Sequence, residues 1–493
     1  MQGITYWIEK RAELHPKRIA IITDKEQITY KTLSQDVNNL ASYLKLKLGI
    51  KRGDRIAILS QNRYEYIVLL FAIAKLECIA VPLNIRLTVN ELVYQINDSE
   101  TETLFIEDIY QQTSNALKEE TCLKEIISID TVRYLKGGNE NVSVETNESA
   151  PYLICYTSGT TGKPKGAVLT QNNMFWNAIN NSLAIDITSS DRSLLLLPLF
   201  HIGGIGLFAF PTLYAGGTII LPEGKFDSER ALMMIEQHQA SIVMGVPTIH
   251  QAILHNPSFD KTNLKSVRWF YNGGAPCPLE IIKAFFDKGL LFGQGFGMTE
   301  TSPTLFMLLK EDAERKMGSI GKPAMFCEYK LIDSEGDVVK DGEVGELIVR
   351  GPNVMKEYWN RPEATAEALR DGWLYTGDLA RVDEEGFLYI VGRKKEMIIS
   401  GGENIYPLEV EQIIGKLADV EEVAVVGVVD QKWGEVPVAF VVKTKESLVT
   451  EEEIIQYCNQ FLAKYKIPKK IEFIDQLPRN ATGKIQKNLL VNT

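Results

Sequence analysis

One short stretch of the chain is rich in groups able to hold phosphate. Residues 156–166 read Tyr156-Thr-Ser-Gly-Thr-Thr-Gly-Lys-Pro-Lys-Gly166. Glycines let a backbone turn tightly and bring its N–H groups close to a ligand, and consecutive N–H groups in a turn bind anions. The stretch departs from the pattern G-x-x-x-x-G-K-[ST], because Pro164 stands where the second glycine would fall when counting starts at Gly159. A polyphosphate-binding loop and a flexible polar loop both fit this composition.

Five further motifs follow along the chain. They read Leu197-Pro-Leu-Phe-His201, Asn272-Gly-Gly-Ala-Pro276, Gly295-Phe-Gly-Met-Thr-Glu300, Tyr375-Thr-Gly-Asp378 and Leu477-Pro-Arg-Asn-Ala-Thr-Gly-Lys484. Taken singly, each motif has an ordinary structural interpretation. His201 could be a buried histidine with its hydrogen bonds made, the Asp378 motif could be a turn, and Lys484 could be a lysine exposed to solvent. Arg393, fifteen residues after Asp378, strengthens that motif.

Together the six motifs resemble, in order, those of the acyl-adenylate-forming superfamily. This superfamily contains acyl- and aryl-CoA ligases, peptide-synthetase adenylation domains and firefly-type luciferases. The resemblance covers essentially the whole chain. Segments such as Ser400–Pro407 and Leu462–Pro468 are most similar to bacterial fatty-acyl-CoA ligases and o-succinylbenzoate-CoA ligase.

The resemblance implies a site for ATP. The residues expected to hold its phosphates are Thr157, Ser158, Gly159, Thr160, Thr161, Gly162, Lys163 and Lys165. Those expected beside its adenine are Gly273, Gly274, Ala275, Pro276, Phe296 and Gly297. Phe296 replaces the tyrosine of most members, which keeps stacking but loses a hydroxyl contact. Asp378, whose carboxylate accepts two hydrogen bonds at once, and Arg393 are expected at the ribose.

The resemblance also implies catalytic roles. Thr299 is expected to contact phosphate, Glu300 to bind Mg²⁺ and His201 to line the acyl pocket. Lys484 matches a mobile catalytic lysine, and Lys395 matches the pivot of a rotating C-terminal domain. Gly401 and Gly402 would let the pantetheine arm of CoA pass close to the backbone.

The chemistry requires such groups, since a carboxylate is a poor nucleophile toward a phosphate of like charge. Mg²⁺, loop N–H groups and Lys484 would neutralise and orient the two partners. Attack on the α-phosphate gives acyl-AMP and pyrophosphate, and a thiol then accepts the acyl group. We therefore expect an AMP-forming acid–thiol ligase that uses ATP, Mg²⁺ and CoA.

The bulk composition sets outer bounds. At 493 residues with 45% hydrophobic and 24% charged residues, more than one globular domain is expected. A net charge of −11 argues against a nucleic-acid partner. Six scattered cysteines and no secretory signal indicate a cytoplasmic protein with reduced thiols. We expect a monomer or a homodimer. The apolar window 194–211 is interrupted by glycine and proline, which favours buried elements over a membrane span and leaves peripheral membrane contact open.

Hydrophobic patterning predicts an α/β fold. Helices over Tyr30–Leu48 and Tyr64–Lys75 alternate with strands over Asp54–Leu59 and Ile79–Leu83, which indicates helix-covered parallel sheets. Strands are also expected over 240–246 and 266–271. A β-rich subdomain should follow, with strands at 329–332, 338–339, 345–350 and 387–391. The last hundred residues predict a small mobile α+β domain of order α-β-β-α-β. We expect an AMP-binding domain over 1–392 and the mobile catalytic domain over 393–493.

Several alternatives stay open. A luciferase-type monooxygenase would share the adenylate, a peptide-synthetase module or other adenylating enzyme would use a non-CoA acceptor, and a pseudoenzyme would only bind nucleotide. Gly203, Gly204 and Gly206 suggest room in the acyl pocket, and Phe200, Phe208 and Met298 an apolar lining. With no obvious buried arginine, a fatty or aryl monocarboxylic acid is favoured, with the dicarboxylate o-succinylbenzoate as runner-up.

Overall fold

The computed structural model describes residues 3–138, 142, 147–157, 163–479 and 485–491. The chain divides into two compact units, one of residues 1–328 with 350–374 and one of residues 329–349 with 375–493. The predicted division into an AMP-binding domain over 1–392 and a mobile catalytic domain over 393–493 stays a prediction.

The first unit contains a nine-stranded sheet of order β15-β14-β13-β12-β11-β9-β10-β1-β2. Its strands are β1 (Ile19–Thr23), β2 (Gln27–Thr29), β9 (Arg192–Leu195), β10 (Thr218–Leu221), β11 (Ile242–Gly245), β12 (Trp269–Asn272), β13 (Phe292–Phe296), β14 (Phe306–Met307) and β15 (Lys322–Pro323). The strands from β13 to β1 pair in parallel, as the predicted alternation of strands and helices requires.

A seven-stranded sheet of order β18-β8-β7-β4-β3-β5-β6 lies in the same unit. Its strands are β3 (Arg55–Leu59), β4 (Ile79–Pro82), β5 (Thr103–Ile106), β6 (Glu125–Ser128), β7 (Pro151–Thr157), β8 (Lys165–Thr170) and β18 (Glu357–Tyr358). β7 and β8 form an antiparallel hairpin at one side, and β4 pairs with β7 in parallel.

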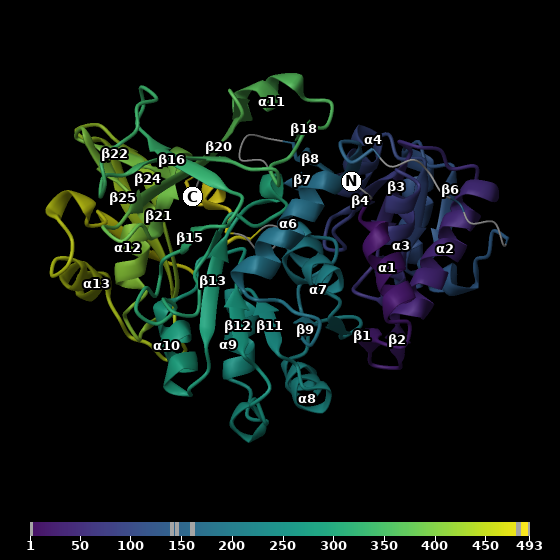
Figure 1. Ribbon diagram of the computed structural model, residues 1–493. Helices are drawn as coiled ribbons and strands as arrows, with labels where there is room; N and C mark the ends of the chain where they lie inside the picture. Colours follow the sequence, from purple (N-terminus) through teal and green to yellow (C-terminus); the bar gives the residue numbers. More distant parts are fainter. Residues whose placement is uncertain (1–2, 139–141, 143–146, 158–162, 480–484, 492–493) are drawn as a thin grey trace. The chain divides into compact units, whose positions relative to one another are not determined.

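Helices cover these sheets (Figure 1). They are α1 (Thr5–Leu14), α2 (Tyr30–Leu46), α3 (Tyr64–Lys75), α4 (Val89–Asp98), α5 (Gln111–Glu120), α6 (Gln171–Ala184), α7 (Phe210–Ala215), α8 (Ser228–His238), α9 (Pro247–Leu254), α10 (Leu279–Asp287) and α11 (Pro362–Ala368). Shorter turns are η1 (Asp108–Tyr110), η2 (Ile129–Tyr134), the π-helical η3 (Gly203–Ala209), η4 (Phe259–Lys261) and η5 (Thr299–Thr301). α3 is buried on nearly every side, which matches its apolar sequence, and α2 confirms the other predicted helix.

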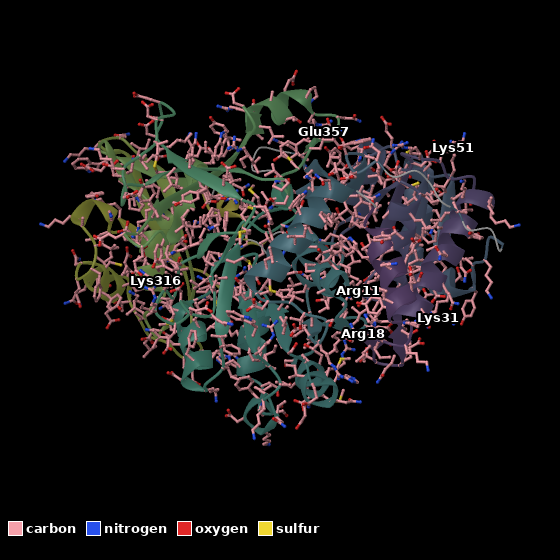
Figure 2. The ribbon with its side chains drawn as sticks, in the orientation of Figure 1. Arg11, Arg18, Lys31, Lys51, Lys316 and Glu357 are labelled. Carbon is pink, nitrogen blue, oxygen red and sulfur yellow. The ribbon has the colours of Figure 1, made fainter. Side chains whose placement is uncertain are left out.

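Charged side chains tie distant segments of this unit together. Arg11 and Arg18, labelled in Figure 2, donate to the carbonyl oxygens of Tyr214 (2.9 Å) and Gly216 (3.5 Å) at the end of α7. The last carbonyls of a helix have no partner within it, so these guanidinium groups satisfy them.

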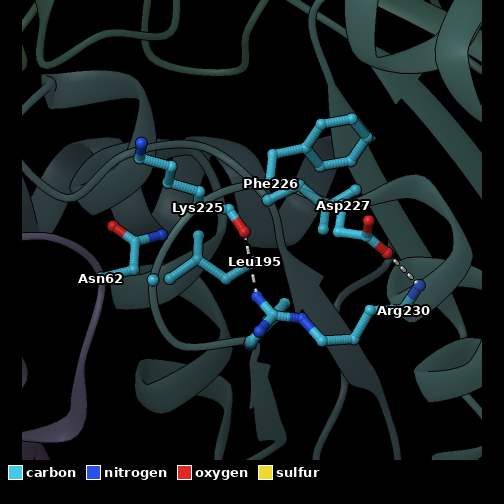
Figure 3. A pocket seen from close by; sticks show the side chains of 9 residues that line it. Asn62, Leu195, Lys225, Phe226, Asp227 and Arg230 are labelled. Carbon is cyan, nitrogen blue, oxygen red and sulfur yellow. Dashed lines mark hydrogen bonds between the residues drawn. The ribbon is translucent and has the colours of Figure 1, made fainter.

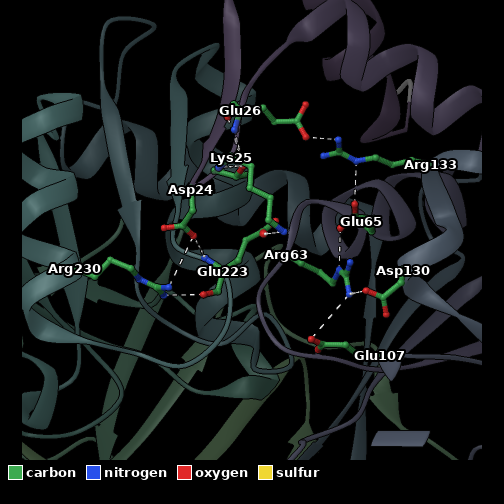
Figure 4. A network of polar contacts seen from close by, with 11 residues as sticks. Asp24, Lys25, Glu26, Arg63, Glu65, Glu107, Asp130, Arg133, Glu223 and Arg230 are labelled. Atoms are coloured by element: carbon green, nitrogen blue, oxygen red, sulfur yellow. Dashed lines mark hydrogen bonds and ion pairs between the residues drawn. The ribbon is translucent and has the colours of Figure 1, made fainter. Parts of the chain in front are cut away.

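A second set of ion pairs surrounds the buried carboxylate of Glu65 (Figure 4). Arg63 lies 2.8 Å from one of its oxygens and Arg133 lies 2.9 Å from the other. Arg133 also pairs with Glu26 in the turn between β1 and β2. A buried charge needs such partners, and this network fastens the β1–β2 hairpin to the α3 region.

The second unit contains two antiparallel-rich sheets. The strands of the first are β16 (Glu328–Ile332), β17 (Gly345–Arg350), β20 (Trp373–Val382) and β21 (Leu388–Arg393). The short strand β19 (Leu369–Arg370) belongs to the stretch 350–374 of the first unit. The strands of the second are β22 (Ile398–Ser400), β23 (Glu403–Ile405), β24 (Val420–Asp430), β25 (Gly434–Lys443) and β26 (Lys470–Phe473). Its helices are α12 (Pro407–Ile414) and α13 (Glu451–Cys458), with turns η6 (Lys394–Glu396), η7 (Lys464–Lys466) and η8 (Lys487–Leu489).

The predicted order α-β-β-α-β of the C-terminal part is confirmed by α12, β24, β25, α13 and β26. The predicted strand at 338–339 is wrong, because Val338 makes only an isolated bridge to Ile332. The short β22–β23 hairpin was not predicted.

The apolar window 194–211 folds as the end of β9, a turn, η3 and the start of α7. In the described part of the chain, no helix has both the length and the hydropathy required to cross a membrane.

Candidate active site

The β7–β8 hairpin frames the predicted phosphate loop. Thr157 and Lys165 are paired at its loop end, where the Thr157 hydroxyl donates to the Lys165 carbonyl at 3.4 Å. Lys163 lies 5.5 Å from the centre of the Tyr94 ring. The loop residues Ser158, Gly159, Thr160, Thr161 and Gly162 lie outside the described residues. Two lysines, Lys163 and Lys165, therefore lie where the loop joins β8.

Helix α4 holds the hairpin on both sides of its loop. The Tyr156 hydroxyl donates to Asp98 Oδ2 at 2.8 Å, and the Tyr94 hydroxyl donates to the Pro164 carbonyl at 2.9 Å. Burial, with the adjacent Asp98 carboxylate, raises the pKa of Tyr156 well above its ordinary value, so its proton stays in place for this bond. Sequence reasoning did not identify Tyr94 or Asp98, since no local motif marks them.

The Glu300 motif follows β13. Thr299 and Glu300 lie in η5, and Glu300 is 6% exposed. The Tyr358 hydroxyl donates to its Oε1 at 2.7 Å. Among the described residues no lysine or arginine forms an ion pair with this carboxylate, so a bound cation would not have to displace one. An anionic oxygen ligand suits Mg²⁺, and Glu300 fits the predicted metal role.

Close backbone packing shapes the segment before Glu300. A Cβ at Gly297 would lie 1.5 Å from the Pro303 carbonyl oxygen, so only glycine fits there. Phe296 is partly buried, with its ring 6.2 Å from that of Phe306.

The turn expected beside adenine follows β12, the neighbouring parallel strand. The Asn272 amide donates to the Ala275 carbonyl at 2.9 Å and closes the turn. Gly273 is buried, whereas Gly274, Ala275 and Pro276 are exposed. Because β12 and β13 are paired in parallel, this turn and Phe296 emerge at the same edge of the sheet.

His201 lies between β9 and η3 in the predicted acyl motif. Burial, with a smaller contribution from Arg86, lowers its pKa to about 4, so the imidazole is neutral at neutral pH. The Phe200 ring lies 4.8 Å from it. Asn62 orients this motif, because its amide donates to the Leu197 carbonyl at 2.9 Å and accepts from the Leu199 N–H at 2.7 Å.

A pocket beside the same motif opens where β9 and β10 end (Figure 3). Its lining residues are Asn62, Leu195, Leu196, Pro222, Gly224, Lys225, Phe226, Asp227 and Arg230. Arg230 donates to the carbonyls of Glu223 (2.7 Å) and Lys225 (3.1 Å), so its guanidinium largely holds the loop together. None of the lining residues was predicted as a site residue.

Gly204 and Gly206 were predicted to leave room in the acyl pocket, and this prediction is wrong. A Cβ at Gly204 would lie 2.1 Å from the Pro198 carbonyl oxygen, and one at Gly206 would lie 2.3 Å from the Ser302 carbonyl oxygen. These two glycines therefore let backbone segments touch and do not leave room for an acid. Of the predicted lining, Phe208 and Phe200 are buried and Met298 is partly exposed.

In the second unit, the two predicted ribose residues meet. Asp378 on β20 pairs in register with Arg393 on β21, and Arg393 Nε lies 2.9 Å from Asp378 Oδ1. Asp378 is buried, and its N–H donates to Thr376 Oγ1 at 3.1 Å. A fixed carboxylate beside a guanidinium can bind vicinal hydroxyl groups.

The predicted pivot and pantetheine residues lie further along the same unit. Lys395 lies in η6, and its neighbour Lys394 pairs with Glu346 at 2.6 Å. Gly401 and Gly402 have φ angles of 60° and 89°, which glycine adopts without strain. A Cβ at Gly401 would lie 2.8 Å from the Trp433 ring.

Lys484 lies outside the described residues. Among the described residues that flank it in sequence, Arg479 and Ile485 form a bridge, and Lys487 pairs with Glu396 (3.1 Å) and Glu411 (2.7 Å). These two carboxylates raise the pKa of Lys487 against the effect of its burial, so this side chain stays charged.

Comparisons with known proteins identify the family. The chain matches the model of the AMP-binding enzyme over residues 8–359 and that of the AMP-binding enzyme C-terminal domain over residues 409–484. A feruloyl-CoA synthase of Amycolatopsis is 41% identical over 486 residues, which cover 99% of this chain and 98% of the relative. The indoleacetate–CoA ligase of Aromatoleum aromaticum is 38% identical over 495 residues, covering 98% and 97%.

A solved structure agrees with these relatives. The o-succinylbenzoate-CoA synthetase of Bacillus subtilis, in complex with its acyl-adenylate intermediate, aligns with a TM-score of 0.90 and 37% identity over 99% of this chain and 98% of that chain. The α/β fold and the resemblance drawn from the six motifs are thereby confirmed, and this chain belongs to the AMP-binding enzyme family.

Proposed function

We propose that this enzyme is an ATP-dependent acid:CoA ligase whose acid is an aromatic monocarboxylic acid. The relatives above are named for CoA ligation of feruloyl, indoleacetate and o-succinylbenzoate acids, each of which carries an aromatic ring. The choice of a monocarboxylic acid rests on where the positively charged side chains lie. Throughout the described ranges no lysine or arginine side chain is fully buried, and Arg86, the cation that acts on His201, is exposed, which supports an acid without a second carboxylate.

The reaction has two steps. A carboxylate oxygen of the acid attacks the α-phosphorus of ATP, the bond to the bridging oxygen breaks, and pyrophosphate leaves. The CoA thiol then loses its proton and its sulfur attacks the acyl carbonyl, and AMP leaves with the electron pair of the mixed anhydride.

We assign residues to these steps as follows. The loop from Thr157 to Lys165 and Thr299 would hold the phosphates, and Asp378 with Arg393 would hold the ribose. Glu300 would hold Mg²⁺, which supplies positive charge to the phosphate oxygens. Neutral His201 would orient the acid without adding charge to its pocket. Lys484 would stabilise the charge that develops on the α-phosphate.

A panel of acids tests the proposal. Pyrophosphate release without CoA, and loss of the CoA thiol with it, are measured for ferulate, indoleacetate, o-succinylbenzoate and palmitate. We expect both reactions with ferulate or indoleacetate at the highest kcat/KM. Pyrophosphate release with no thiol loss for any acid would instead indicate a different acceptor.

The second candidate is o-succinylbenzoate–CoA ligation, which the structural match to the Bacillus subtilis enzyme favours. A kcat/KM for o-succinylbenzoate at least about tenfold above that of the monocarboxylic acids, a difference of about 1.4 kcal/mol, would establish it.

A cytoplasmic location is part of the proposal. All six cysteines lie in the described part of the chain and are free thiols, five of them buried. Free thiols are typical of proteins kept in a reducing compartment. The oligomeric state, monomer or homodimer, stays a prediction.

A further inference from the structure

One segment links three parts of the phosphate site. We call residues 355–361 the strap. The Met355 N–H donates to the Glu300 carbonyl at 2.7 Å. The Lys356 N–H then donates to the Val168 carbonyl at 2.9 Å, and the Trp359 N–H to the Gly166 carbonyl at 2.8 Å. The strap therefore runs from the Glu300 motif to β8, the strand that leaves the phosphate loop.

The middle of the strap is β18, whose first residue, Glu357, is labelled in Figure 2. Its second residue, Tyr358, pairs with Ala167 of β8. From this position the Tyr358 hydroxyl reaches Glu300 Oε1 at 2.7 Å. The Lys165 ammonium lies 5.1 Å from the centre of the Tyr358 ring, within the range of a cation–π contact. One side chain thus contacts both Glu300 and a lysine of the loop.

The far end of the strap is fastened to α4. Trp359 Nε1 donates to the Asp98 carbonyl at 3.1 Å, and Arg361 pairs with the Asp98 carboxylate at 2.5 Å. The same carboxylate accepts the Tyr156 hydroxyl at the entry to the phosphate loop. The backbone of Tyr358 is therefore held from both sides, which fixes where its hydroxyl points.

We propose that Tyr358 is a positioning residue for the metal-binding carboxylate of Glu300. Its hydroxyl occupies Oε1, holds the carboxylate in one orientation and leaves Oε2 for a divalent cation. Partners of this kind orient metal ligands, and their loss typically weakens metal binding about 10- to 100-fold. The inference rests on the proposed function, in which Glu300 binds the cation that accompanies ATP.

The test measures cation binding directly. Mn²⁺ is titrated into ATP with and without the full-length protein, and free Mn²⁺, followed by electron paramagnetic resonance, is compared between the two because ATP alone also binds Mn²⁺. Tyr358→Phe removes the hydroxyl alone, and we expect it to weaken Mn²⁺ binding about tenfold. In acid-dependent pyrophosphate release, the Mg²⁺ requirement should rise while KM for the acid stays unchanged.

Tyr30→Phe is the matched control. The Tyr30 hydroxyl is fully buried and donates to the Gly217 carbonyl at 2.8 Å, so this variant also loses a tyrosine hydroxyl bond. We expect it to bind Mn²⁺ like the parent. Superimposable titrations of Tyr358→Phe and the parent, or an equal loss in Tyr30→Phe, would overturn the proposal.

A double-mutant cycle separates positioning from stability. In a Glu300→Gln background, Tyr358→Phe should weaken Mn²⁺ binding no further, whereas a full additional loss contradicts the inference. Tyr358→Met serves as a second variant where the phenylalanine side chain impairs folding. A parent that binds Mn²⁺ with ATP but turns over no acid in the panel would refute the proposed function and leave this inference standing. A parent that binds no Mn²⁺ with ATP refutes the inference itself.

Discussion

Asp378 and Arg393 face each other across paired strands, with Arg393 Nε 2.9 Å from Asp378 Oδ1. The Asp378 side chain is buried and the Arg393 side chain is about one-third exposed, at 34%. The pair therefore presents an anchored acceptor beside a more accessible donor, an arrangement suited to the hydroxyl groups of a ribose.

Replacing Asp378 with asparagine should weaken ATP binding about tenfold, because hydrogen bonds to a charged acceptor contribute about 1.5–3 kcal/mol and a neutral amide loses most of this. KM for the acid should not change. Isothermal titration with ATP gives the affinity.

Glu346→Gln is the control for this experiment. Glu346 is also buried and pairs with a neighbouring cation, Lys394, at 2.6 Å. It should bind ATP like the parent. Equal losses in the two variants would show that the sheet, and not a contact with the ribose, depends on these carboxylates.

The buried histidine of α9 makes stability depend on pH. His250 is 0% exposed, its Nε2 lies 3.1 Å from the Tyr271 carbonyl, and burial lowers its pKa to about 4. Since the unfolded chain binds the proton near pH 6.5, acid favours unfolding. The contribution to stability is complete above pH 6.5 and is lost as pH falls toward 4, by about 2 kcal/mol at pH 5.

Urea denaturation of the parent and of His250→Gln at pH 7, 6 and 5 measures this effect. The parent should lose more stability than the variant between pH 7 and 5, although the variant is less stable at pH 7. Parallel pH profiles would contradict the assignment to His250.

Much of the fold and site could be predicted because local patterns encode it. The α2 region has the alternation of an amphipathic helix, and the α3 region is almost entirely apolar. Each of the six motifs contains its reactive groups within a few residues. Asp378 and Arg393 could be assigned to one site because both match motifs of the family and stand fifteen residues apart, and their cross-strand pairing agrees with this assignment.

What the sequence did not reveal depends on contacts between distant segments. Tyr358 reaches Glu300 across 58 positions in the chain, and nothing in the local sequence around Tyr358 indicates that contact. Gly206 was interpreted as space for an acid, but the Ser302 carbonyl oxygen fills that space. The sequence alone does not distinguish a glycine that leaves space for a ligand from one that allows a neighbouring backbone segment to pack closely.

Lys484→Ala should abolish most acyl-AMP formation and largely spare the thioester step. Losing one charge contact in a transition state typically costs about 10²–10³ in rate. The two half-reactions are measured separately, with synthetic acyl-AMP supplied for the second. Equal losses in both would refute a role confined to adenylation. Lys487→Ala is a useful comparison, because Lys487 pairs with Glu396 and Glu411 and should affect stability more than either half-reaction.

Lys395→Pro should have the opposite selectivity. If the C-terminal part pivots at this residue, a fixed φ near −65° resists the rotation, so adenylation continues while transfer to CoA is blocked. Lys395 lies in the short turn η6, directly after Arg393 and Lys394. The competing interpretation is that Lys395 is one more surface cation in this basic run, and in that case its backbone freedom has no role.

Lys395→Ala separates these interpretations, because it removes the charge and keeps the freedom of φ. We expect the alanine variant to transfer acyl groups at a rate near that of the parent, and the proline variant to lose transfer by at least about tenfold with acyl-AMP formation retained. Circular dichroism of both variants checks that the fold is intact. Should the proline variant convert synthetic acyl-AMP to acyl-CoA at the parent rate, the pivot does not lie at Lys395. Should alanine and proline lose transfer equally, the charge of Lys395, for example toward a phosphate of CoA, accounts for the effect and backbone rotation does not.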